Sequence, residues 1–476
     1  MKMSPDFRTR VLLLICILGF CISILVNYPG FMSTDSFVLI LEAREGVYSN
    51  GHPPFVAFLW HQMDRLTPGP LGMLLLQTSL LWIGTFLVSQ YWFAIDSSFF
   101  LALSASLIIF YPPIFTITGA IWKDIFMLGF LMMAIGVAGA VRSHPHRVSW
   151  CFFTGVALIA LLLFMANLFR YNAVFAAVPL MVLGIAQGLP KGWKFRTLVA
   201  GIAGTLACAV ILSAVSFVNR KLTTYSINQW GFAAIFDVAG TIYHTPDPQT
   251  RQELYQRIPS RIRGDGGLER LLETYDSREW LEMFRGPSAG LAVPPLVDNV
   301  PALQRLWSVF QLNAQEEKAL FNLWMDCVVH HTYPWLRHRV SVFKGIIGLD
   351  GRNLWAPVFM NPNGGQERVA RFYGKNPPLN HFQSALEWRF EALSKHLFYR
   401  PWIYLLLTIA IITLCLFFWN EDRADVFLIA LSGLTHEGTL FFLAPAAPYR
   451  YSHYMIYTSI LATLLLIRFS PASRRG

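Results

Sequence analysis

Uninterrupted apolar runs of roughly 18 residues or more recur along this chain, and each is long enough to cross a bilayer as a helix. Hydrophobic residues fill 54% of the 476 positions and charged residues only 14%, whereas a soluble domain carries about 25% charged residues. These features predict an all-α, polytopic membrane protein. We expect about ten transmembrane helices, at about 11–26, 71–93, 98–115, 124–141, 150–168, 173–188, 197–217, 401–419, 424–443 and 454–468.

The polar segment 218–400 divides the chain. It is charged and rich in Pro and Gly, and its pattern Asn313-Ala-Gln-Glu316 is typical of a capping box. This pattern predicts a helix through Val329 that Pro334 breaks. We therefore expect an N-terminal transmembrane module (1–217, with a first outer loop at 28–70), a mostly helical outer domain (218–400) and a C-terminal transmembrane module (401–476).

The net charge of +10 comes from short Lys and Arg clusters between the apolar runs. Such clusters are typical of the cytoplasmic loops of membrane proteins, so the charge does not indicate nucleic-acid binding. An N-terminus in the cytoplasm places the richest clusters on that side, among them Arg142, Arg196, Arg423 and Arg468. The charge pattern predicts a multi-pass protein of the plasma (inner) membrane, with both termini cytoplasmic and 218–400 outside.

The first outer loop contains two amphipathic segments around a His-Pro-Pro turn. Segment 36–45 is expected to be an interfacial helix, with its apolar side chains on one side and Glu42 and Arg44 on the other. The turn at His52, Pro53 and Pro54 ends it, and an apolar-faced helix follows over 55–63. The loop is thus predicted to lie along the membrane surface.

In this orientation, polar residues that interrupt apolar sequence gather on the outer side. An ionisable group near lipid costs about 2.5–3.5 kcal/mol, so such groups are candidates for a functional site. Simpler interpretations remain open: Asp35 could be a helix N-cap, Lys123 and Asp124 a pair at a helix start, and the arginines could reach for headgroups. The candidates are Asp35, His52, Lys123, Asp124, Arg170, Asn172, His436, Glu437, Arg450, Tyr451 and His453.

The chemistry that this set suits is group transfer involving an anionic lipid. Lys123, Arg170 and Arg450 are the side chains that a membrane-surface phosphate requires. Asp35 could deprotonate an acceptor hydroxyl. Asp35 and Asp124 could instead hold Mg²⁺ or Mn²⁺ against the phosphate, and this divalent ion is the one cofactor candidate.

The segments GFMSTDSF, NGHPP, AIWKD, LFRYNA and PYRYSHYMIY, in this order among many spans, give the chain a resemblance to the GT-C glycosyltransferase superfamily. That superfamily includes protein O-mannosyltransferases, aminoarabinose transferases and oligosaccharyltransferases. The resemblance implies that Asp35 is the catalytic base or a metal ligand, and that Lys123, Arg170 or Arg450 binds the phosphate of a polyprenyl-phosphate-linked sugar. Many members have two adjacent acids in the first loop, whereas Ser36 follows Asp35 here, which leaves metal dependence open.

The resulting expectation is an inverting glycosyltransferase that moves a sugar from a polyprenyl-phosphate donor to an envelope glycan, lipid or protein. Its substrate-binding residues would be His52, Lys123, Arg170, Asn172, Arg450, Tyr451 and His453. The alternatives are an envelope enzyme similar to an O-antigen ligase or polymerase, and a transporter. A transporter would need charges at mid-membrane depth and an internal repeat, neither of which the sequence indicates.

Overall fold

The computed structural model describes residues 4–94, 99–143, 150–190, 195–263, 267–279, 311–360 and 381–470. Regular structure in these ranges is helical, with isolated β-bridges between loops. Within them, seven helical segments are long and apolar enough to cross a membrane. They are α1 (Pro5–Asn27), α4 with the following π-turn (Leu71–Phe93), α7 (Lys123–Ser143), α8 (Trp150–Phe169), a 3-10 turn with α9 (Tyr171–Gly188), α10 (Arg196–Leu222) and α21 (Glu421–Leu443).

Three of the ten expected spans are not among these seven. Two are shorter helices, α20 (Pro401–Phe417) and α22 (His453–Arg468). The expected span at 98–115 is instead α5 (Phe99–Ser106), a 3-10 turn (Ile108–Phe110) and α6 (Pro112–Phe115). Tyr111 has extended backbone angles because it precedes a proline, which disfavours a helical conformation there. The described residues thus give seven spans by length and composition, and ten stays a prediction.

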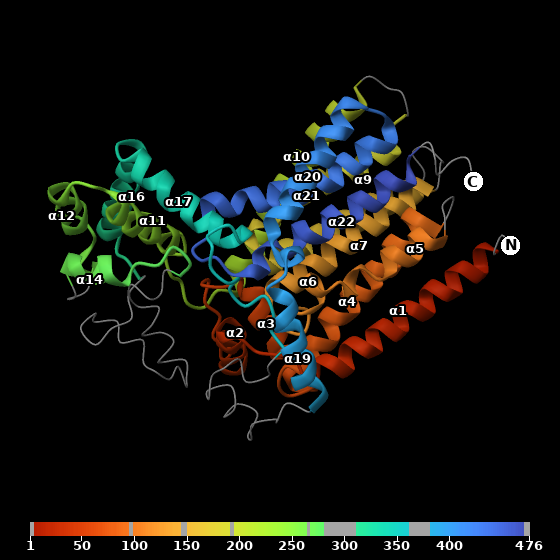
Figure 1. Cartoon of the computed structure of the whole chain (residues 1–476), viewed down its shortest axis with the longest axis horizontal. Helices are drawn as coiled ribbons and strands as arrows, with labels where there is room; N and C mark the ends of the chain where they lie inside the picture. The colour runs from red at the N-terminus through yellow and green to blue at the C-terminus, as the bar shows by residue number, and fades with distance from the viewer. Residues whose placement is uncertain are drawn as a thin grey trace.

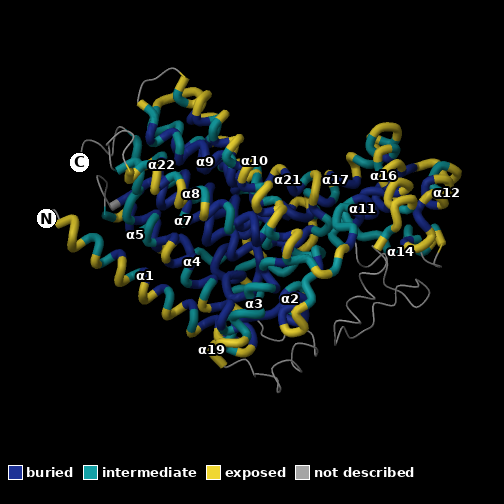
Figure 2. The backbone as a smooth tube through the Cα atoms, turned by 180° about the vertical axis from the view of Figure 1, so that it is seen from behind, coloured by how far each residue is buried: buried dark blue, intermediate teal, exposed yellow. Residues whose placement is uncertain are grey.

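Helix α7 lies at the centre of the bundle and packs against α4, α8 and α9. Its contact with α4 is close because glycines face bulky side chains: a Cβ on Gly136 would lie 2.4 Å from the Leu87 Cβ, and one on Gly129 would lie 2.7 Å from the Leu80 Cβ. Small residues allow helices to approach in this way inside membranes. Figure 2 shows the buried backbone concentrated around α4 and α7, with many exposed positions along α1.

A smaller helical unit lies to one side of the bundle (Figure 1) and surrounds its own apolar core. The Asn313–Glu316 capping box starts α16 as predicted, and this helix ends at Val329. Pro334, however, does not end that helix: it lies in the first turn of α17, where its missing N–H costs no helical hydrogen bond. The unit comprises α11 (Trp230–His244), α12 (Pro248–Gln256), α13 (Ser260–Arg263), α14 (Gly267–Thr274) and α16 (Ala314–Val329), and α17 (Thr332–Ile347) joins it to α21.

The two helices predicted in the first outer loop are present as α2 (Thr34–Glu45) and α3 (Pro54–Leu66). The N-cap of α2 is Ser33, so the interpretation of Asp35 as an N-cap is wrong. Glu42 was expected on the polar side of α2, yet it is 2% exposed and accepts a hydrogen bond of 2.5 Å from Ser49. The helix is enclosed on that side because the loop after it folds back over it.

Candidate functional site

A short β-bridge brings the first outer loop to the start of α7. The Phe31 N–H donates to Gly119 O at 2.9 Å, and the Ile121 N–H donates to Phe31 O at 2.9 Å. Gly119 is required at this approach, because a Cβ there would lie 2.3 Å from the Asn27 Oδ1. The Ser36 hydroxyl adds a 2.8 Å bond to Ile121 O. The bridge therefore places the start of α2 beside the first turn of α7.

Arg450 connects the two carboxylates that this bridge brings close. Its Nη2 lies 2.5 Å from an oxygen of Asp35, and its Nε lies 3.8 Å from Asp124. On the other side of Asp124, Arg170 Nε lies 3.2 Å from the remaining carboxylate oxygen. Arg450 lies on a 3-10 turn (Tyr449–Ser452) ahead of α22, so four elements contribute to one charged chain.

Each of the two guanidinium groups lies over an aromatic ring. The guanidinium carbon of Arg450 lies 4.5 Å from the centre of the Trp122 ring, and that of Arg170 lies 4.7 Å from the Tyr451 ring. Such cation–π contacts stabilise a positive charge without using its N–H donors. The rings therefore leave the guanidinium N–H groups to the carboxylates of Asp35 and Asp124, and a phosphate that replaced a carboxylate could accept from the same fork-shaped donors.

Lys123 and His52 form a second contact in the cluster, with the Lys123 Nζ 2.6 Å from the His52 Nδ1. Burial first, and then the Lys123 charge, lower the pKa of His52 to about 3. The imidazole is therefore neutral, and its Nδ1 accepts from the ammonium. The loop that leads to His52 is held in place by hydrogen bonds to residues 223–227. In one of them, the Ile227 N–H donates to Asn50 Oδ1 at 2.6 Å.

Asp35 differs from the other acids of the cluster because its side chain is 31% exposed, whereas that of Asp124 is 1% exposed. Partial burial disfavours its charge, but Arg450 and the nearby Lys123 outweigh this and hold the pKa of Asp35 well below its usual range. Asp35 is thus an ionised carboxylate that a second molecule can reach.

The remaining candidates surround this chain of charges. Asn172 Nδ2 lies 3.5 Å from His436 Nε2, and His453 Nδ1 lies 2.6 Å from Arg450 O. Glu437 accepts a hydrogen bond from the Ser452 hydroxyl at 2.7 Å. The nine residues that were expected to be catalytic, substrate-binding or metal-binding, and the two further candidates His436 and Glu437, thus lie in one connected neighbourhood.

Glu42 is a residue of this neighbourhood that sequence reasoning missed. Burial is the main influence on it and raises its pKa to about 7, although the Ser49 bond and the Lys123 charge act in the opposite direction. A carboxyl group with a pKa near neutrality can hold or release a proton at physiological pH. The sequence pattern of α2 did not indicate that Glu42 is buried, because the segment that covers its side chain, which includes Ser49, lies outside this helix.

The two acids do not fit a divalent ion. Asp35 and Asp124 are joined by the Arg450 guanidinium, and Arg170 and Lys123 add two further positive groups. A metal ion would have to displace an arginine and lie among like charges. The described residues also contain no group of three or more His, Cys, Asp or Glu that could hold a metal ion.

The arrangement is one of three cations and one accessible carboxylate at one end of a helical bundle, which suits binding of a phosphate beside a group that accepts a proton. No protein-family description, curated protein or solved structure matches the chain.

Proposed function

We propose that this chain is a membrane glycosyltransferase that moves a sugar from a polyprenyl-phosphate donor to an acceptor hydroxyl. The observation that carries the proposal is the contact between Asp35 and Arg450, with Lys123 and Arg170 beside it. A lipid-linked phosphate needs cations at membrane-surface depth, and the acceptor needs a carboxylate next to the sugar. The reaction takes place on the outer face of the plasma membrane.

Arg450 has two roles in the proposed reaction. Before the donor binds, it neutralises Asp35; when the donor phosphate arrives, its guanidinium turns to the phosphate oxygens together with Lys123 and Arg170. The pKa of Asp35 then rises, because the charge that held it down has a new partner. Donor binding thereby converts a weakly basic carboxylate into a base.

The bond changes follow from this geometry. Asp35 takes the proton of the acceptor hydroxyl, and the acceptor oxygen attacks the anomeric carbon. The bond between that carbon and the phosphate oxygen breaks, and polyprenyl phosphate leaves with the bonding electron pair. A single displacement of this kind inverts the anomeric centre. The cations stabilise the charge that develops on the leaving phosphate.

The other two functions are less well supported. A 28–64 loop far from Arg170 and Arg450 would favour a ligase- or polymerase-type envelope enzyme, whereas Asp35 contacts Arg450. A transporter would need charges at mid-membrane depth, whereas Asp35, Lys123, Arg170 and Arg450 lie at or beyond helix ends.

The test is a donor-turnover assay with the full chain in lipid nanodiscs. Polyprenyl-phosphate mannose, glucose, N-acetylglucosamine and aminoarabinose are supplied in turn, and free polyprenyl phosphate is measured by mass spectrometry. We expect Asp35→Asn to lower the rate at least about a hundredfold. The matched variant Glu45→Gln, on the exposed end of the same helix, should match the wild type. An Asp35→Asn rate equal to that of the wild type, or no turnover of any donor, would refute the proposal.

A further inference from the structure

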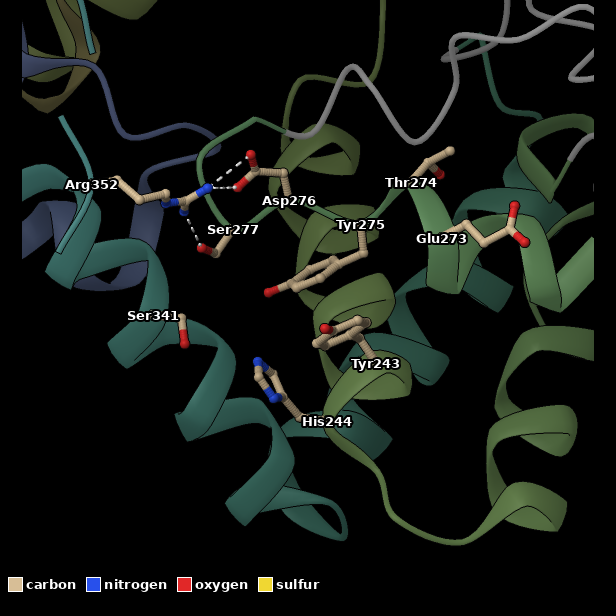
Figure 3. Close-up of a pocket in the computed structure, with 9 residues that line it drawn as sticks. All are labelled: Tyr243, His244, Glu273, Thr274, Tyr275, Asp276, Ser277, Ser341 and Arg352. Carbon is tan, nitrogen blue, oxygen red and sulfur yellow. Dashed lines mark hydrogen bonds and ion pairs between the residues drawn. The ribbon is translucent and has the colours of Figure 1, made fainter. Parts of the chain in front are cut away.

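A cavity of about 600 Å³ opens in the smaller helical unit, apart from the residues of the charged cluster (Figure 3). Its walls come from the end of α11, the end of α14 with the residues after it, α17 and the loop that follows α17. The lining residues that matter here are Tyr243, His244, Glu273, Tyr275, Ser341 and Arg352. A volume of this size is in the range of small-molecule binding sites.

One wall of the cavity is an aromatic platform. The rings of Tyr243 and Tyr275 stack with their centres 4.3 Å apart and their planes 25° from parallel. His244 meets the Tyr243 ring edge-on, at 5.1 Å and 89°. Tyr243 remains 40% exposed although it is stacked. An aromatic face left open in a cavity attracts C–H groups, which carry partial positive charge, because the ring face is negative.

Two polar side chains on this wall, Tyr275 and His244, are available to form hydrogen bonds with a ligand. The Tyr275 hydroxyl lies 2.8 Å from Nδ1 of the fully buried His338, whose Nε2 faces Asp237 at 3.4 Å. When the His338 proton is on Nε2, the nitrogen that faces the Asp237 carboxylate, the Tyr275 hydroxyl donates to Nδ1 and its lone pairs remain for a donor in the cavity. His244 also lines the cavity, and its Nε2 has no hydrogen-bond partner among the residues that the structure describes. Figure 3 shows both side chains directed to the same space.

The charged groups around the cavity largely cancel. Arg352 bonds both carboxylate oxygens of Asp276, at 3.0 and 3.1 Å, and an oxygen of Asp350 at 3.1 Å. Burial first, and then the charges of His338 and Arg337, lower the pKa of His244 to about 4, so this ring is neutral. Glu273 is exposed at the rim. An anionic ligand would therefore find no unpaired cation among these groups, whereas hydroxyl groups would find acceptors and donors.

We propose that this cavity binds a neutral saccharide, with one sugar ring packed on the Tyr243–Tyr275 platform and its hydroxyls bonded to the Tyr275 hydroxyl and His244. The inference deepens the proposed function, on which it rests for the assignment of this saccharide as part of the acceptor. A backbone hydrogen bond links the wall of this cavity to the charged cluster. The Ala447 N–H donates to Arg278 O at 2.8 Å, which ties the cavity wall to the loop carrying Arg450.

The experiment measures saccharide binding alone, without any donor. The full chain in nanodiscs is titrated with maltotriose, cellotriose, mannotriose and di-N-acetylchitobiose, and binding is followed by saturation-transfer NMR and calorimetry. We expect one or more of them to bind, and Tyr243→Ala to weaken that binding roughly tenfold. Tyr243→Phe should bind nearly as the wild type, because it keeps the ring. Tyr333→Ala, which removes an exposed tyrosine of α17 outside the cavity, is the matched control.

The outcomes separate this inference from the glycosyltransferase proposal. Asp35→Asn should bind saccharide as the wild type does even though it fails in transfer. No binding of the four probes at millimolar concentration, or equal binding by Tyr243→Ala and the wild type, would overturn the saccharide site. Saturable binding of tetramethylammonium in place of saccharides, lost in Tyr243→Ala, would also overturn it, because the platform would then be a cation site.

Discussion

The guanidinium of Arg450 donates a hydrogen bond of 2.5 Å to the carboxylate of Asp35, which lies 415 residues earlier in the chain. The same guanidinium lies 3.8 Å from Asp124. One side chain near the C-terminal end thus neutralises acids from the first outer loop and from α7. Removal of its charge would leave the two carboxylates to Arg170 and Lys123, and removal of its planar shape would leave one of them without this guanidinium.

Arg450→Lys tests the role of the guanidinium shape, because it keeps the positive charge. An ammonium is a point charge on a flexible stem, so it cannot reach Asp35 and Asp124 at once as the planar fork does. We expect kcat/KM for the polyprenyl-phosphate donor to fall at least about a hundredfold, which corresponds to about 2.7 kcal/mol of transition-state stabilisation. The measurement is steady-state release of polyprenyl phosphate in nanodiscs.

The control for this prediction is Arg337→Lys, which changes an arginine that packs on the exposed Tyr333 ring of α17. It should leave kcat/KM within about twofold of the wild type, because surface cation contacts contribute little. If Arg450→Lys were as active as Arg337→Lys, the positive charge alone would be enough and the bridging geometry would have no role.

Much of the site could be anticipated from the sequence because its members interrupt apolar sequence at span ends. Asp35, Lys123, Arg170 and Arg450 were predicted together on that basis, and in the structure they lie in one neighbourhood. Their pairing could not be predicted, because it depends on the Phe31–Ala120 bridge and on the close approach at Gly119. Contacts across hundreds of residues leave no periodic pattern.

The errors about local structure have related causes. The side chain of Glu42 looked solvated because helical periodicity describes one helix only, and the Ser49 loop that covers it is a separate element. The span at 98–115 is largely apolar, but α5 ends at Ser106 and the extended Tyr111 before Pro112 prevents a continuous helix. Hydropathy indicates that a segment is buried or in lipid and does not indicate whether it is continuous.

Glu42→Gln should stabilise the protein in a pH-dependent way. The pKa of Glu42 is about 7 in the folded protein, against about 4.3 for an ordinary glutamate. The unfolded chain therefore loses this proton first, and folding stability falls as pH rises from about 4 to about 7. Gln keeps the acceptor for Ser49 and cannot ionise, so the gain should be up to about 4 kcal/mol above pH 7 and close to zero below pH 4.

This prediction is checked by thermal unfolding in detergent at pH 5 and pH 8. The midpoint of Glu42→Gln should exceed that of the wild type by more at pH 8 than at pH 5. Glu45→Gln, an exposed neighbour on α2, should show no such difference. Equal shifts of Glu42→Gln at the two pH values would mean that the carboxyl is not held protonated.

An ion-pair cluster at the other end of the bundle should support stability without affecting transfer. Arg142 at the end of α7 bonds Asp422 at 2.5 Å and also bonds Asp425, whose side chain is 2% exposed. Arg142→Ala leaves the buried Asp425 carboxylate with Gln187 as its donor among the described residues, and the expected loss is about 3–5 kcal/mol. Thermal unfolding should show this loss, and adding Asp425→Asn to Arg142→Ala should recover most of it.

Transfer per folded molecule should be unchanged in Arg142→Ala, because the cluster at Arg142 is remote from Asp35 along α7. Arg423→Ala provides the control on the same end of the bundle, since Arg423 bonds a backbone carbonyl in an exposed setting and should cost at most about 1 kcal/mol. A selective loss of donor turnover in Arg142→Ala, with stability intact, would show that the two ends are coupled.

The two charged ends should also face opposite sides of the membrane. The start of α1 and the end of α22 lie at the same end of the bundle, because Thr9 bonds Gln90 and Arg468 bonds the Trp92 carbonyl.

Cysteines are introduced singly at Glu45, Lys318 and Asn420, which are all exposed, after replacement of the exposed Cys21 and Cys151 by serine. The positive-inside rule predicts that a membrane-impermeant maleimide reaches positions 45 and 318 in intact cells and reaches 420 only after permeabilisation. Labelling of positions 45 and 420 from the same side would contradict the placement of the two ends on opposite sides of the membrane. The reverse pattern, with only 420 reached in intact cells, would put the Asp35 cluster on the cytoplasmic face and contradict the proposed site of transfer.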